Sequence, residues 1–110
     1  MIELIIFKDS TDTIQGFELS GHADSGPHGH DLVCAAVSAV SFGAANSIIE
    51  ICQIEPEIEQ GAEGGYLKLL LPERMSDEQQ DKAQTLLKGM YVTFQTIERD
   101  YHQYISISEK

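Results

Sequence analysis

The longest uncharged run of the chain, Leu32 to Ile49, constrains its fold more than any other feature. Several small and polar residues interrupt the run and it lacks basic flanks, so a core helix is favoured over a membrane span. A helix that is apolar or small on most sides needs cover, and a chain of 110 residues has little material to provide it. Part of that cover can come from a second copy, which favours a homodimer.

Ahead of this run, two apolar segments predict a β-hairpin. Residues 2–7 and 13–20 contain β-branched and aromatic side chains, and "KDSTD" lies near the turn between them. The helix is expected to begin at Asp31, whose carboxylate can accept hydrogen bonds from the unpaired amides of the first turn. It is expected to run to about Gln53, because Pro56 cannot continue it.

The rest of the chain predicts a second hairpin, a second helix and a final strand. The hairpin is "EIEQGAEGGYLKLLLPE", and the helix follows a capping box formed by Ser76 and Gln79. Gly89 within that helix is expected to mark a close packing contact, and "YHQYISISE" predicts a short strand. The order ββαββαβ predicts one α+β domain, residues 1–110, with two helices packed on a mainly antiparallel sheet.

Charge and cysteine content narrow the classes of function. A formal net charge of −11 argues against nucleic acid as the direct partner; it either serves solubility or attracts a basic partner. The N-terminus "MIELIIFKDS" lacks the basic region of a signal peptide. Cys34 and Cys52 would lie about 27 Å apart on one helix, too far for a disulfide. Free thiols suit a reducing compartment, so a cytoplasmic protein is expected.

Cys34 is the candidate nucleophile. It lies in the first turn of the expected helix, where unpaired amides and the helix dipole favour the thiolate. Its pKa is therefore expected below the ordinary value of about 8.5. Cys52, at the other end of the helix, has the opposite environment.

Three histidines close to Cys34 are candidate proton donors for a leaving group. His28 and His30 belong to the glycine-rich segment "DSGPHGHD", whereas His22 ends the second strand. An anchored position can hold an imidazole against a helix start, which favours His22. Asp31 either orients that histidine or only caps the helix, and the sequence leaves both open.

A contiguous signature then points to a known family. The chain contains "SGHA", a short glycine-containing loop, "DLVCAAVSA" and Asn46. This pattern resembles the ribosomal-processing cysteine protease family Prp, and the resemblance extends over the whole chain. It implies a homodimeric cysteine endopeptidase without a cofactor, which removes a short N-terminal extension from a large-subunit ribosomal protein.

The resemblance also assigns residues. The catalytic pair of the family matches His22 and Cys34, while Asp31 and Ser38 match supporting positions. The loop between the pair is implied to gate the substrate, with glycines that allow it to move. Those glycines are Gly26 and Gly29, and the loop departs from the family pattern in its extra histidines, His28 and His30.

Two other readings compete with the protease. One is a metal site, since ligand-type residues gather within a short span, although no zinc-binding spacing appears. Its ligands would come from His22, His28, His30, Asp31 and Cys34. We expect no metal. The other is a non-enzymatic module that binds a ribosomal protein or assembly factor, with Cys34 as a core residue.

Overall fold

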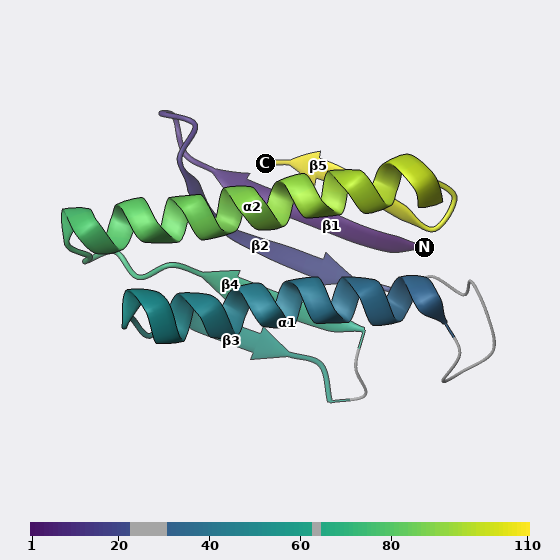
Figure 1. Cartoon of the computed structure of the whole chain (residues 1–110), viewed down its shortest axis with the longest axis horizontal. Helices are drawn as coiled ribbons and strands as arrows, with labels where there is room; N and C mark the ends of the chain where they lie inside the picture. Colours follow the sequence, from purple (N-terminus) through teal and green to yellow (C-terminus); the bar gives the residue numbers. More distant parts are fainter. Residues whose placement is uncertain (23–30, 63–64) are drawn as a thin grey trace.

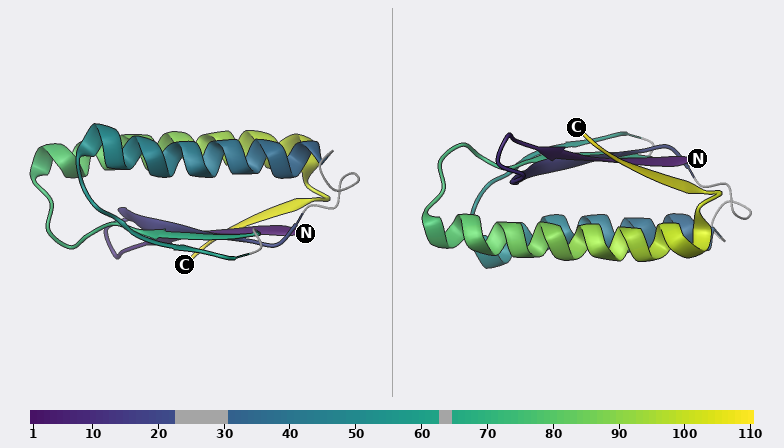
Figure 2. Two further views of the ribbon diagram at one scale, coloured as in Figure 1. Left: turned by 90° about the horizontal axis from the view of Figure 1, so that it is seen from below. Right: turned by 90° about the horizontal axis from the view of Figure 1, so that it is seen from above.

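A five-stranded sheet carries two helices on one face. The structure is a computed structural model that describes residues 1–22, 31–62 and 65–110. Both helices lie in one layer against the same side of the sheet (Figure 2). The elements are β1 (Ile2–Lys8), β2 (Ile14–Ser20), α1 (Leu32–Cys52), β3 (Glu57–Gln60), β4 (Tyr66–Leu70), α2 (Asp77–Tyr101) and β5 (Ile105–Glu109). The predicted order ββαββαβ and the α+β class are confirmed.

The sheet is mixed, although mostly antiparallel. Its strand order is β3-β4-β2-β1-β5, and the pairing of β1 with β5 is parallel. The two predicted hairpins pair as β1 with β2 and β3 with β4, and β4 also pairs antiparallel with β2. In Figure 1, α1 lies over β3 and β4, and α2 lies over β1. The largest fully buried side chains include Phe17, Phe94, Leu4, Ile6, Ile14 and Ile48.

Helix α1 buries a single stripe of its surface. The stripe consists of Val33, Val37, Ser41, Ala45, Ile48 and Cys52. The hydroxyl of the buried Ser41 donates to the Val37 carbonyl at 2.8 Å, so its burial leaves no unpaired polar atom. A single chain leaves other parts of α1 uncovered, because Leu32, Phe42 and Ile51 remain 76%, 40% and 53% exposed, and cover by a second copy stays a prediction. By length and composition α1 could cross a membrane, a property that it shares with core helices of soluble proteins.

A glutamine in the first turn of α2 forms a hydrogen bond to the end of α1. The predicted capping box is confirmed: Ser76 Oγ accepts from the Gln79 amide at 3.1 Å, and Gln79 Oε1 accepts from the Ser76 amide at 2.9 Å. The Gln79 side-chain amide also donates to the carbonyl of Cys52 at 3.1 Å, at the end of α1. The start of α2 therefore satisfies a backbone acceptor at the end of α1.

Gly89 does not mark a packing contact. It is exposed on α2, and a Cβ atom built there would meet nothing within 4 Å among the described residues. The expectation of close packing at this glycine is wrong.

Candidate active site

Cys34 lies in the first turn of α1, as predicted. The helix begins at Leu32, and Asp31 is its N-cap with an extended backbone. The carboxylate of Asp31 accepts from the Cys34 amide at 3.0 Å, which confirms the capping role of Asp31. The Cys34 side chain is half-buried and packs against the edge of the core.

The N-cap decides which amides at the helix start can bind a ligand. The Cys34 amide already donates to Asp31, and the Ala35 amide donates to the Asp31 carbonyl at 3.0 Å. Within the described part of the chain, no acceptor pairs with the amides of Leu32 and Val33. These two donors at the positive end of α1 are therefore suited to an anionic oxygen beside Cys34.

Cys52 has the environment of a structural thiol. It is the last residue of α1, it is 3% exposed, and burial raises the pKa of its thiol. Neither cysteine forms a disulfide, as the predicted separation along α1 requires. Of the two thiols, only Cys34 combines partial exposure with a helix start.

His22 follows the end of β2 by two residues and is exposed. Between them, Gly21 has a positive φ of 92°, and its amide donates to the Gly65 carbonyl at 2.8 Å. The imidazole lies against Gly65, since a Cβ atom built on that glycine would lie 2.6 Å from His22 Nε2. The backbone around His22 is thus tied to the start of β4.

The elements that carry His22 and Cys34 meet at one end of the molecule. The end of β2, the start of β4 and the start of α1 all lie at this end in Figures 1 and 2. Ser38 lies one helical turn beyond Cys34 and is exposed. The loop residues Gly26, Gly29, His28 and His30 lie outside the described residues. Within residues 1–22, 31–62 and 65–110, no three metal-ligating side chains cluster.

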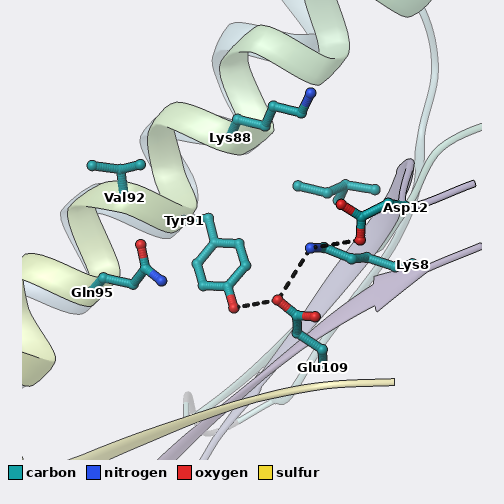
Figure 3. Close-up of a pocket in the computed structure, with 8 residues that line it drawn as sticks. Lys8, Asp12, Lys88, Tyr91, Val92, Gln95 and Glu109 are labelled. Atoms are coloured by element: carbon teal, nitrogen blue, oxygen red, sulfur yellow. Dashed lines mark hydrogen bonds and ion pairs between the residues drawn. The ribbon is translucent and has the colours of Figure 1, made fainter.

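A hollow lies near Lys8, at the end of β1 (Figure 3). It has a volume of about 370 Å³ and is lined by Lys8, Asp12, Ile14, Lys88, Tyr91, Val92, Gln95 and Glu109. Lys8 bridges Asp12 and Glu109, each at 3.1 Å, and the Tyr91 hydroxyl donates to Glu109 at 2.6 Å. The hydrogen bond from Tyr91, and then Lys8, hold the pKa of Glu109 below its ordinary value. The residues that line this hollow include no cysteine, serine or threonine, and its ionic network joins β5 to β1 and α2.

The chain is similar to one family of proteases over nearly its whole length. The family model described as cysteine protease Prp matches residues 1–106. The ribosomal processing cysteine protease Prp of Bacillus subtilis is 43% identical over 108 residues, covering 98% of this chain and 96% of that protein. The protein of the same name from Staphylococcus aureus is 41% identical, covering 84% of this chain and 83% of its own.

Solved structures match over the full length. A crystal structure of the S. aureus protease Prp with a covalently linked product peptide superposes with a TM-score of 0.89 at 37% identity, covering 100% of both chains. A second structure of that protease, with a substrate peptide, gives a TM-score of 0.82 at 36% identity and the same coverage. SMU.848 from Streptococcus mutans, at 24% identity and a TM-score of 0.83, shares the fold.

The fold and the family match define the class of the protein as a cysteine protease. Within that class, the chain belongs to the Prp family.

The N-cap provides a test of the role of Asp31. Asp31→Ala should lower the free energy of unfolding by about 1 kcal/mol, because the Cys34 amide loses its acceptor. Asp31→Asn keeps a capping oxygen and should restore most of that stability. Denaturant unfolding and peptide cleavage are measured on both variants. Equal loss of cleavage in both, with stability restored only in Asp31→Asn, would show that the charge has a role beyond capping.

Gly65 is the residue at this end of the molecule that sequence reasoning missed. From the sequence, Gly65 is placed only within the predicted second hairpin. No local pattern links it to His22, since the two meet through the pairing of β2 with β4.

Proposed function

We propose that this chain is a ribosomal-processing endopeptidase, in which Cys34 is the nucleophile and His22 transfers the proton. The observation that carries the proposal is the position of Cys34, half-buried in the first turn of α1 beside two amides without acceptors in the described structure. β2, which ends two residues before His22, has its C-terminal end at the same end of the molecule as the start of α1. The relatives named as ribosomal processing proteases, one of them with a covalently linked product peptide, support the same assignment.

The mechanism follows from the helix start. The Cys34 thiolate attacks the scissile carbonyl, forming a carbon–sulfur bond and an oxyanion. The amides of Leu32 and Val33 donate to that oxygen, because the Cys34 amide is held by Asp31. His22 gives a proton to the leaving amine, and water then hydrolyses the acyl-enzyme, which regenerates the thiol and the carboxylic acid product.

The proposed substrate is the N-terminal extension of a large-subunit ribosomal protein. Ribosomal proteins are basic, and the net charge of −11 on this chain favours their approach. Leu32, exposed beside Cys34, offers an apolar contact for the extension. The ribosomal substrate and the family match support a cytoplasmic location.

The test of this function is cleavage of a peptide that spans the extension and the start of the mature ribosomal protein from the same genome. We expect one cut, located by mass spectrometry, and none in a peptide with the same residues in scrambled order. Binding of the peptide without any cut by the intact protein would favour a non-enzymatic module.

We propose in addition that the chain forms a homodimer through the outer surface of α1. Phe42 and Ile49 are 40% and 39% exposed and lie seven residues apart, on the same side of this helix, and burying such side chains against a second copy is favourable. Light scattering should give about twice the 12.2 kDa mass of one chain. Phe42→Glu with Ile49→Glu should give the monomer mass. Val92→Glu is the matched control, because Val92 is 61% exposed on α2. A monomer mass for the unaltered chain would contradict the proposal.

A further inference from the structure

The turn before β4 places a glycine directly against the imidazole of His22. A Cβ atom built on Gly65 would lie 2.6 Å from His22 Nε2, 2.9 Å from Cε1 and 3.4 Å from Cδ2. The first two separations are shorter than real Cβ atoms show, so a side chain at this position would displace the ring. The volume that a side chain would need is the volume that the imidazole fills.

The backbone fixes this relationship. The last registered pair of β2 and β4 is Ser20 with Tyr66, and the Gly21 amide extends the ladder by donating to the Gly65 carbonyl at 2.8 Å. Both glycines have positive φ, 92° at Gly21 and 77° at Gly65. Two facing positions without side chains thus end the ladder, and the ring of the next residue, His22, lies over the second.

We propose that Gly65 is a positioning residue for His22. The glycine leaves a site on the sheet edge in which the imidazole rests, and this contact restricts the side-chain conformations from which it transfers a proton to the leaving group beside Cys34. The inference rests on the proposed function, in which His22 is the proton donor. It adds the turn between β3 and β4 to the machinery of the reaction.

Exposure of His22 separates this role from a structural one. The ring lies at the surface, so it can rotate away from a new side chain at little cost to folding. A ring that rotates away in this manner loses its contact with position 65. A side chain at position 65 is therefore expected to lower kcat much more than it lowers the free energy of unfolding.

The experiment compares Gly65→Ala with Gly65→Asn. At φ 77° alanine is strained, while asparagine tolerates the left-handed region, but both place a Cβ atom at the same point. Displacement of His22 predicts that both variants lose kcat by roughly 10- to 100-fold with KM nearly unchanged. Gly89→Ala is the matched control, because a Cβ atom at Gly89 meets no described neighbour. A kcat of Gly65→Asn within twofold of that of the unaltered protein would overturn the proposal, because any loss in Gly65→Ala would then come from backbone strain alone.

Two further readouts test whether Gly65 acts through His22. The imidazole proton and carbon NMR signals of His22 should shift in both Gly65 variants and remain in place in Gly89→Ala. In a His22→Ala background, Gly65→Ala should change the rate of Cys34 alkylation by less than twofold. An unchanged His22 spectrum in the Gly65 variants would contradict the inference. So would an equal loss of the Cys34 alkylation rate on Gly65→Ala in the presence of His22 and in the His22→Ala background.

These outcomes distinguish the inference from the proposed function. If His22→Ala keeps full cleavage, His22 is not the proton donor and the proposed function fails in that part, while the NMR shifts still report on the contact. If His22→Ala loses cleavage and the Gly65 variants do not, the proposed function stands and the positioning role is wrong.

Discussion

Replacement of Cys34 by alanine should lower the rate of peptide cleavage by on the order of 10⁴-fold or more, because no other described side chain at that helix start supplies a nucleophile. Cys34 is only half-buried, so the free energy of unfolding should change by about 1 kcal/mol or less. Cleavage is followed with a fluorogenic peptide and stability by denaturant unfolding. Binding of the uncut peptide to Cys34→Ala, measured by calorimetry, should persist.

Cys52→Ala is the matched control for that variant. It removes a buried thiol from the far end of the same helix, so it should destabilise the fold while leaving kcat within about twofold. Cys34→Ala is thus expected to lose cleavage and keep its stability, whereas Cys52→Ala is expected to lose stability and keep its cleavage. Full cleavage by Cys34→Ala would refute the protease mechanism and leave Cys34 as a structural residue.

At neutral pH, iodoacetamide should label Cys34 roughly 100-fold faster than Cys52. The thiolate reacts, and the helix start favours the thiolate of Cys34. Burial raises the pKa of Cys52 and also shields its sulfur, so labelling there requires local opening of the fold. Mass spectrometry of tryptic peptides after timed quenching gives both rates in a single sample.

The pH dependence of iodoacetamide labelling also tests whether the start of α1 favours the thiolate of Cys34. The Cys34 rate should rise with pH and level off below the ordinary cysteine pKa of about 8.5, while the Cys52 rate should still be rising above it. The protein unfolded in denaturant is the control, in which both thiols should react at similar rates. Equal rates in the folded protein would contradict activation of Cys34 by the start of α1.

Local chemistry explains which features were predictable from the sequence. Asp31 and Ser76 cap the two helices by contacts within three residues, so their roles can be deduced from neighbouring side chains alone. The position of Cys34 follows directly from the cap at Asp31. The capping role of Asp31 is confirmed, because its carboxylate accepts from the Cys34 amide, while a role in orienting His22 stays a prediction.

Features that depend on distant pairing were not predictable. The contact of Gly65 with His22 arises from the register of β2 against β4, which no local pattern specifies. The parallel pairing of β5 with β1 likewise joins the two ends of the chain. The face of α1 that meets the sheet was not predictable either, because composition counts apolar residues without placing them on one side of the helix.

The parallel pairing of the first and last strands has a consequence for folding during translation. The strands and helix that carry His22, Cys34 and Gly65 all precede residue 71, so they can assemble early on the ribosome. The free edge of β1 has to wait for β5, since β5 pairs with β1 and the Lys8 amide donates to the carbonyl of Lys110. A nascent chain therefore completes this sheet only after β5 has left the ribosome, which is long after the residues around Cys34 have emerged.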